Sequence, residues 1–338
     1  ETGFTPMLEF LPTLSKERLE ENLSWLAPGG YNPANGNVVL CYQSYVVKTP
    51  HHNILVDACI GNDKNFPLRP SWNGKNDPHW MNALKAAGLG VGDIDYVMCS
   101  HLHGDHVGWN TRMENGRWVP TFPKAKYIFS KQEFDMWNPA EADHVEIEIN
   151  QNVFNDSVLP VVESGQAVLI DGNHALEGGI LIEPAPGHTP GMMLMKLDGE
   201  SRPGTHGDRA VFCGDVIHHA LQVYAPHWAH IVDQDEEHER EQQDSTREGH
   251  DLVETGRNAA EGNDLEQGEQ DVTAVENGQG QKVEQGEVDE ALGFPAADAV
   301  VLRRTTGRPG PLVVLPRALI DFHEGLDDRI VVAPVGPH

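Results

Sequence analysis

The chain has 338 residues, of which 39% are hydrophobic, so it is long enough for one large domain or two small ones with a sizeable core. Its formal net charge of -28 at pH 7 argues against a nucleic-acid binder or a protein of anionic membrane surfaces, because phosphate groups would be repelled. No apolar run is long enough to span a bilayer, and the four cysteines form no CxxC pair, so we expect reduced thiols rather than a disulfide framework.

The first half of the chain predicts strands followed by a loop, a helix and another strand. Residues 37–60 contain two β-rich runs separated by TPHH, which predicts a hairpin. Residues 61–78 are rich in Gly, Pro and Asn and predict a surface loop, and residues 79–88 have helical spacing that ends at a Gly. The short apolar run IDYVMCS then predicts a strand that leads directly into HLHGDHVGW.

The middle of the chain continues this alternation. KAKYIFS predicts a strand, KQEFDMWN begins a helix, and residues 158–170 and 179–184 are strand-like. LMKLDG and AVFCGDVI continue the strand pattern, and the second of these ends at Asp215. Three predicted strands therefore deliver polar clusters at their carboxyl ends, and the alternation of strands and helices predicts an α/β layered fold.

The pattern breaks in an acidic segment near the end of the chain. Residues 233–290 carry 20 acidic and four basic residues, and no aromatic residue follows Asp235 until after Glu290. Such a segment buries too little apolar area to offset its ordering entropy. We therefore expect a core at residues 1–232, a disordered insertion at 233–290, and C-terminal strands at 291–338 that complete the fold.

The strongest motif is His101-Leu102-His103-Gly104-Asp105-His106. Two His separated by one residue on an extended segment point the same way, so both imidazoles can reach one metal ion. Asp105 and His106 follow at once and can face a second ion. Imidazole nitrogen and carboxylate oxygen are ligands that zinc accepts. The alternative, a surface His cluster without metal, is disfavoured by the full string after an apolar strand.

Two further motifs follow in the chain. His188 lies in Pro-Gly-His-Thr-Pro-Gly, where a fixed turn presents the ring with little freedom to lose, although an ordinary turn His would look the same. Asp215 follows Gly214 at the end of a predicted strand, where a carboxylate can bridge two cations or simply cap a helix. The three motifs reinforce one another.

HLHGDHVGW, APGHTPG and CGDV, in that order, resemble the metallo-β-lactamase superfamily. Trp109 and the stretches FPKAKYIFSKQEFDMW and DVIHHALQV are most similar to its branch of lactonase-like and methyl-parathion-hydrolase-like enzymes. The resemblance covers residues 30–235 and implies an αββα sandwich of two facing mixed sheets with outer helices. It also implies that His101, His103 and His188 hold a first metal, that Asp105 and His106 hold a second, and that Asp215 bridges the two.

The resemblance leaves the last ligand of the second metal open. The family usually has a final His after a late strand, and the acidic segment occupies the expected place here. If that segment is an insertion, His323 after PLVVLPRALID is the expected ligand, with His338 as a weaker rival; His238 and His250 are expected to be solvated. If the tail is not homologous, the second metal lacks a ligand.

Other residues have expected supporting roles. Asp57 in ILVDACIGND matches a strand-end Asp that supports the site from behind the ligands, although a plain turn Asp fits equally well. His218 and His219 are expected behind the ligands or in the pocket. Trp109 is expected to line an apolar pocket wall or, equally, to pack in the core.

These expectations converge on a metal-dependent hydrolase that uses a hydroxide bridging two divalent ions, most simply Zn²⁺, with Asp105 orienting the water and carrying a proton to the leaving group. The expected substrate is a lactone or carboxylic ester. The alternatives are an organophosphate or phosphoester hydrolase and a weakened or non-catalytic protein with an incomplete second site.

The expected partner is a small-molecule substrate, with no nucleic acid and no membrane, and a homodimer is left open. No leader pattern is visible, so a cytoplasmic location is expected, although the chain does not begin with Met and its N-terminus can be incomplete.

Overall fold

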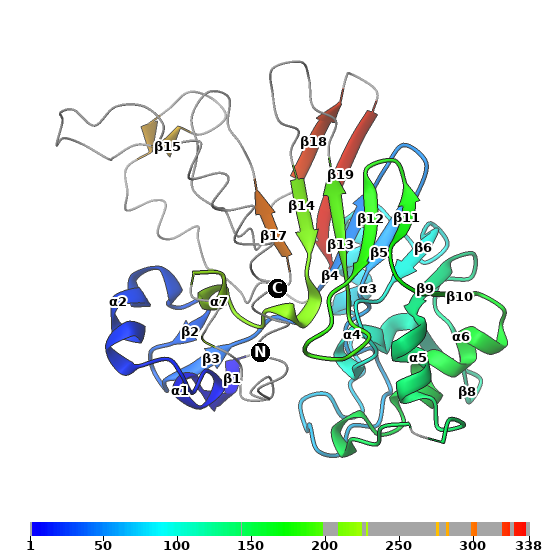
Figure 1. Ribbon diagram of the computed structural model, residues 1–338, viewed down its shortest axis with the longest axis horizontal. Helices are drawn as coiled ribbons and strands as arrows, with labels where there is room; N and C mark the ends of the chain where they lie inside the picture. Colours follow the sequence, from blue (N-terminus) through cyan, green and yellow to red (C-terminus); the bar gives the residue numbers. More distant parts are fainter. Residues whose placement is uncertain are drawn as a thin grey trace.

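A computed structural model describes residues 2–142, 144–198, 209–224 and 228. Of the remaining chain it describes the backbone of five strands between residues 275 and 335. Its main body is a pair of β-sheets that face one another, flanked by helices (Figure 1). No helix within the described ranges is long and apolar enough to cross a bilayer.

The larger sheet has seven strands in the order β10-β9-β6-β5-β4-β19-β18. Its strands are β4 (Ser44–Lys48), β5 (Asn53–Val56), β6 (Tyr96–Met98), β9 (Lys126–Ser130), β10 (Ala167–Ile170), β18 (Ile320–Glu324) and β19 (Asp328–Val335). Strands β5, β6, β9 and β10 pair in parallel, whereas β5-β4-β19-β18 are antiparallel, so the sheet is mixed.

The smaller sheet has five antiparallel strands in the order β11-β12-β13-β14-β17. They are β11 (His174–Glu177), β12 (Ile180–Pro184), β13 (Met193–Asp198), β14 (Arg209–Phe212) and β17 (Ala299–Leu302). The backbone of the C-terminal stretch thus pairs as β17 with this sheet and as β18 and β19 with the larger one.

One hydrophobic core lies between the two sheets. The larger sheet supplies Val47, Ile54 and Met98, among others, and the smaller sheet supplies Met195 and Phe212. Successive side chains of a strand point to opposite faces. In β5, Ile54 and Val56 therefore face this core, while Leu55 between them faces the other way.

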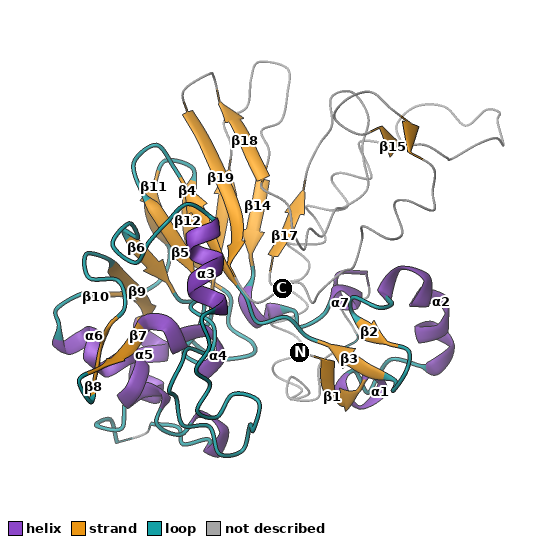
Figure 2. Ribbon diagram, turned by 180° about the vertical axis from the view of Figure 1, so that it is seen from behind, coloured by secondary structure: helices purple, strands orange, loops and turns teal. Residues whose placement is uncertain are grey.

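Helices lie over the second face of the larger sheet (Figure 2). A second core is buried beneath them. It contains Leu55 and Tyr127 of the sheet together with Trp80, Trp137 and Val161 from three helices. These helices are α3 (His79–Ala86), α5 (Lys131–Trp137) and α6 (Leu159–Glu163). The order helix, sheet, sheet is the layered α/β fold that the alternation predicts.

A smaller N-terminal unit packs beside the sheets. It contains β1 (Thr2–Pro6), β2 (Tyr31–Asn32), β3 (Asn37–Val39), α1 (Met7–Phe10) and α2 (Lys16–Leu26). Ser15 caps α2, since its hydroxyl accepts a hydrogen bond from the backbone N–H of Arg18. Leu221 of α7 (Ala220–Tyr224) is buried in the core of this unit, which joins the unit to the chain that follows β14.

The remaining α-helix and strands among the described residues are short. They are α4 (Gly104–Val107), the hairpin of β7 (Thr111–Glu114) and β8 (Arg117–Pro120), and the pair β15 (Val275–Glu276) and β16 (Lys282–Val283). Apart from that last pair, residues 233–290 lie outside the described residues, so the expected disorder stays a prediction.

The strand prediction for residues 158–170 is wrong in its first half. Residues 159–163 form helix α6, and only Ala167–Ile170 form a strand. The β-branched residues favoured a strand, but Val158 and Val161 are spaced by one helical turn and are both fully buried. Pro160 sits in the first turn of the helix, where its missing N–H costs nothing.

Candidate metal centre

The predicted site residues follow strand ends of both sheets. Asp57 follows β5 and His101 follows β6, two parallel strands whose carboxyl ends share one edge. His188 lies between β12 and β13, and Asp215 follows β14 of the smaller sheet. Helix α4, which carries Asp105 and His106, lies at this edge (Figure 1). The two sheets therefore bring three distant motifs together.

Three imidazoles converge as the motif spacing predicts. His103 Nδ1 lies 3.0 Å from His101 Nε2 and 3.0 Å from His188 Nε2. The His101 ring is fully buried. Burial, followed by the neighbouring imidazoles, holds the pKa of both His101 and His103 well below the ordinary value. Both rings are therefore neutral near pH 7, the form that binds a metal.

Asp215 contacts both this group and His106. One carboxylate oxygen is 3.1 Å from His106 Nε2, and the other is 3.6 Å from His188 Nε2. Burial alone would lower the pKa of His106, but Asp215, Asp105 and Asp57 raise it well above the ordinary value. The carboxylate of Asp105 is 3.8 Å from His106 Nε2, and burial raises the pKa of this carboxyl.

His218 is closer to the site than the sequence suggests. Its Nε2 is 3.4 Å from Asp215 Oδ2, and its ring makes an edge contact with His188 at a centroid separation of 4.8 Å. With His188 and Asp215 it forms a third group whose ligand atoms lie within 4.8 Å of one another. Its position three residues after Asp215 was visible in the sequence, but nothing there separated it from His219.

Asp57 supports His106 directly. Its Oδ2 lies 2.9 Å from His106 Nδ1 and accepts a hydrogen bond from the Ser100 hydroxyl at 2.9 Å. Its Oδ1 accepts one from the Ser100 backbone N–H at 2.7 Å. The backbone of Asp57 has φ 55°, a left-handed conformation that non-glycine residues rarely adopt. Ser100, next to His101, was not predicted, although it stands directly before the motif.

Two side chains that bind the backbone of the His103 and His188 loops were not predicted from the sequence. The buried Glu133 of α5 accepts hydrogen bonds from the backbone N–H of Leu102 at 3.1 Å and of Gly191 at 3.1 Å. Asn150 accepts one from the N–H of Gly104 at 3.0 Å and donates one to the carbonyl of Leu102 at 3.2 Å. No sequence pattern identifies side chains that bind backbone groups tens of residues away.

Helix α4 is held against the loop after β5 by backbone contact. The N–H of Gly108 donates to Cys59 O at 2.6 Å, and the N–H of Ala58 donates to His106 O at 2.7 Å. A Cβ atom on Gly108 would lie 1.9 Å from the backbone of Ile60. Only glycine therefore fits at position 108, and this close approach fixes Asp57 relative to His106.

Other predicted residues lie elsewhere. Trp109 is 7% exposed and stacks on Trp80 at 5.2 Å, so it packs in the core rather than lining a pocket wall. His219 is buried, and its Nε2 lies 3.0 Å from Gly30 O of the N-terminal unit; its described hydrogen bonds reach none of the clustered ligands. For Trp109, core packing is thus the one of its two expected roles that the contacts favour. For His219, the described contacts join the N-terminal unit rather than the clustered His and Asp residues.

The side chains of the candidate final ligands lie outside the described residues. His323 is within strand β18, where it pairs with Arg329, and its side chain lies outside the described residues. His238, His250 and His338 also lie outside them. The last ligand of a second metal therefore stays a prediction.

The donor set fits divalent metal ions. Ring nitrogens that share one tetrahedral zinc, each at about 2.0–2.1 Å from it, are about 3.3 Å apart. The separations of 3.0 Å around His103 are close to that value. Two groups of three ligands, His101 with His103 and His188, and His101 with His106 and Asp215, each gather their ligand atoms within 4.8 Å. Imidazoles and a carboxylate are a zinc-type set.

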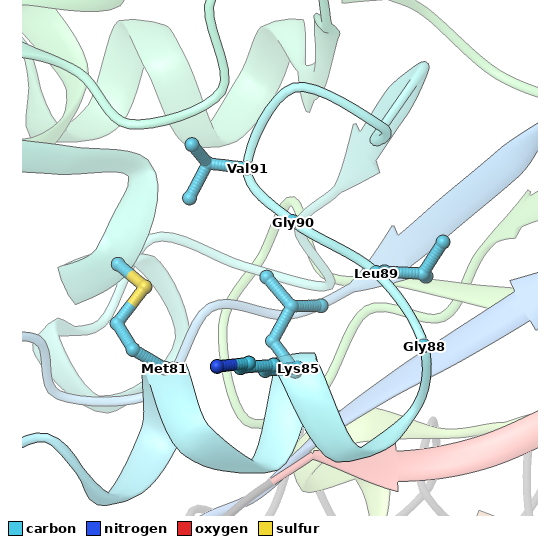
Figure 3. Close-up of a pocket in the computed structure, with 7 residues that line it drawn as sticks. Met81, Lys85, Gly88, Leu89, Gly90 and Val91 are labelled. Carbon is cyan, nitrogen blue, oxygen red and sulfur yellow. The ribbon is translucent and has the colours of Figure 1, made fainter.

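A separate hollow lies at the end of α3 (Figure 3). It has a volume of about 390 Å³ and is lined mainly by apolar groups, including Met81, Leu84 and Leu89. None of the predicted site residues lines it, so it is distinct from the His/Asp cluster.

Comparison with known proteins agrees with this geometry. The family model described as the metallo-beta-lactamase superfamily matches residues 42–261. An N-acyl homoserine lactonase of a Bacillus species is 27% identical over 120 residues, which cover 36% of this chain and 39% of the relative. The N-acyl homoserine lactonase AiiB of Agrobacterium fabrum is 24% identical over 213 residues, which cover 58% of this chain and 73% of the relative.

Two solved structures share the fold. A probable metal-dependent hydrolase from Staphylococcus aureus has a TM-score of 0.53 at 18% identity and covers 74% of this chain and 79% of its own. AidC, a dizinc quorum-quenching lactonase in complex with a product, has a TM-score of 0.51 at 21% identity and covers 74% of this chain and 80% of its own. By its motifs, its layered fold of two facing sheets and the match of the family model, the chain belongs to the metallo-beta-lactamase superfamily.

Proposed function

We propose that the chain is a metal-dependent hydrolase that opens a lactone or cleaves a carboxylic ester at a site for two divalent ions. The observation that carries the proposal is the convergence of His101, His103 and His188. Beside them, one oxygen of the Asp215 carboxylate contacts His188 and the other contacts His106. A carboxylate that contacts two imidazoles through separate oxygens is suited to hold two cations close together.

The sequence relatives support the choice of substrate class. Those reported above are N-acyl homoserine lactonases, although the Bacillus enzyme is matched over only 39% of its length. The expected cofactor is Zn²⁺, because the donor set consists of imidazoles and carboxylates. The expected partner is a small neutral molecule, since a chain of net charge -28 repels polyanions.

Two divalent ions at this site would polarise the scissile carbonyl and lower the pKa of water near it. The chain's own residues then have separate tasks. His101, His103 and His188 would hold the first ion, Asp105 and His106 would hold the second, and Asp215 would be shared between them. Asp57 fixes the His106 ring through Nδ1, which leaves Nε2 to face the site. Asp105 orients the attacking water and carries a proton to the leaving oxygen.

A substrate panel with metal analysis tests the proposal. The zinc-loaded full chain is assayed on an N-acyl homoserine lactone, an aryl ester and a phosphotriester, beside His103→Ala and the distant variant His51→Ala. We expect lactone or ester turnover that His103→Ala abolishes and His51→Ala retains. Preference for the phosphotriester would assign the second candidate activity. No turnover on any substrate, with fully loaded protein, would support a non-catalytic role and contradict the proposal.

A further inference from the structure

We propose that Glu133 and Asn150 form a clamp that holds the ligands of the first metal in place before the metal binds. The clamp is defined as these two side chains with the peptide groups they bind at Leu102, Gly104 and Gly191. This inference rests on the proposed metal-dependent function, but it concerns residues that do not touch the metal.

The clamp holds the peptide between two ligands from both sides. Leu102 separates His101 from His103; its N–H donates to Glu133 Oε2 at 3.1 Å, and its carbonyl accepts from Asn150 Nδ2 at 3.2 Å. The N–H of Gly104 donates to Asn150 Oδ1 at 3.0 Å. The backbone on each side of His103 is thus fixed by hydrogen bonds to side chains from α5 and from the segment before α6.

The clamp also ties the two ligand loops together. Glu133 Oε1 accepts a hydrogen bond from the N–H of Gly191, three residues after His188. A Cβ atom on Gly191 would lie 2.5 Å from the backbone nitrogen of Glu133, so only glycine permits this approach. One carboxylate therefore connects the loop of His103 with the loop of His188, which belong to different sheets.

Trp137 extends the connection to a ligand ring. Its indole N–H donates to Glu133 Oε2 at 2.9 Å, and its ring makes an edge contact with the His103 ring at a centroid separation of 5.3 Å. The Trp137 ring thus limits the rotation of His103 while Glu133 holds Trp137.

The burial of the Glu133 carboxylate costs free energy that a purely structural role would not require. Glu133 is 0% exposed, and its described partners are three N–H groups rather than a cation. A buried carboxylate is expensive unless its surroundings compensate the charge. Two nearby cations would provide that compensation, whereas a neutral side chain would fill the same space at lower cost.

Zinc affinity tests the clamp in the full-length protein. Glu133→Gln keeps the size of the side chain but removes its charge and gives one terminal atom hydrogens that face N–H donors. Asn150→Leu is close in size and removes both hydrogen bonds without adding charge. The matched controls are Glu163→Gln and Asn82→Leu, at exposed positions on α6 and α3. Metal-free proteins are titrated with Zn²⁺ against a chromogenic chelator, and the Co²⁺-loaded proteins are compared by visible absorption.

We expect both clamp variants to bind the first Zn²⁺ about tenfold to a hundredfold more weakly, the range found when groups that orient metal ligands are removed. We also expect an altered Co²⁺ spectrum, with both controls unchanged. If a clamp variant loses thermal stability but keeps the wild-type affinity and Co²⁺ spectrum, the clamp is only structural and the inference is wrong. If Glu133→Gln does not fold, Asn150→Leu decides alone.

These measurements do not depend on a substrate. If the wild-type protein binds zinc but hydrolyses nothing, the proposed function fails while the affinity comparison still judges the clamp. If the wild-type protein is active and both clamp variants bind zinc as tightly as it does, the clamp fails while the function stands.

Discussion

At the residue scale, Asp57 shows how a single side chain connects the fold to the site. It accepts two hydrogen bonds from Ser100 and contacts Nδ1 of His106, from a backbone in the left-handed region. Because the Nδ1 contact fixes the tautomer, Nε2 of His106 is the nitrogen left to bind a metal. A strained conformation that places a buried carboxylate against a ligand is typical of a functional position.

Asp57→Asn should therefore weaken metal binding with little change in shape. We expect zinc affinity to fall about tenfold to a hundredfold, because the amide presents an N–H₂ group where a carboxylate oxygen accepted a hydrogen bond. Chelator competition measures the effect, with the exposed Asp171→Asn as control. Equal zinc affinity in the two variants would show that Asp57 does not support His106.

The buried amine of Lys64, which is distinct from the proposed metal ligands, should make the stability of the protein depend on pH. This amine donates to Thr111 Oγ1 at 2.6 Å and lies 3.5 Å from the centroid of the Trp118 ring. Burial lowers the pKa of Lys64 from 10.5 to about 7. Between these pH values the unfolded chain binds more protons than the folded chain, so this group makes the free energy of unfolding rise with pH.

Lys64→Met should remove that dependence. The stability of the wild type relative to Lys64→Met should increase from pH 7 to pH 10, because only the wild type releases a proton on folding there. Urea unfolding across this range measures the difference, and the exposed Lys16→Met should show no such trend. A difference that stays constant or shrinks with rising pH would contradict the lowered pKa.

Sequence reasoning identified the proposed ligands that are contiguous in the chain, and it missed the side chains that bind the backbone around them. His101 to His106 stand together after an apolar strand, so alternation along the chain predicts their convergence. Glu133 instead follows Ser130 by three residues, a spacing typical of a helix cap. Ser130 does accept a hydrogen bond from the N–H of Glu133, but the carboxylate turns to loops 31 and 58 residues away in sequence. These long-range hydrogen bonds of Glu133 become visible only in the folded structure.

At the scale of elements, the contact between α4 and the loop after β5 sets the geometry of the site. The backbone of Gly108 touches that of Ile60, and the two hydrogen bonds beside this contact run between Ala58, Cys59 and the α4 segment. A side chain on Gly108 would push α4, and with it Asp105 and His106, away from Asp57.

Gly108→Ala should destabilise the protein by about 3 kcal/mol or more, since a buried backbone contact leaves no room for a methyl group. The control is Gly92→Ala, where a Cβ atom would meet nothing within 4 Å and a change within about 0.5 kcal/mol is expected. Urea unfolding of the metal-free proteins measures both. Equal stability of the two variants would contradict the close packing of α4.

Strand prediction succeeded at the β-rich apolar runs and failed in the first half of residues 158–170. The runs at 37–60, at KAKYIFS and at 179–184 became strands β4, β5, β9 and β12, whose apolar side chains are buried on one or both faces of a sheet. Residues 159–163 became a helix despite their β-branched composition, because Val158 and Val161 fit a helical stripe over the larger sheet.

At the scale of the whole molecule, the packing of the two sheets holds the proposed metal ligands together, since His101 follows a strand of one sheet and His188 and Asp215 follow strands of the other. Met195 of β13 is fully buried between the sheets with Phe212 and Ile54. The interface is therefore both the main core and the base of the site.

Met195→Ala should cost about 2–5 kcal/mol of unfolding free energy through lost burial and the cavity that remains. Leu169→Ala, at a side chain that is 43% exposed on β10, should cost far less. Urea unfolding compares the two variants. A loss at Met195 no larger than that at Leu169 would contradict a shared core between the sheets.

Elemental analysis of the purified full chain tests the central claim most directly, because the account requires His101, His103, His106, His188 and Asp215 to hold metal together. We expect about two zinc ions per chain, falling to about one or fewer in Asp215→Ala, since that carboxylate contacts both ligand groups. A wild-type chain that retains no metal after exposure to zinc and removal of the excess would contradict the account.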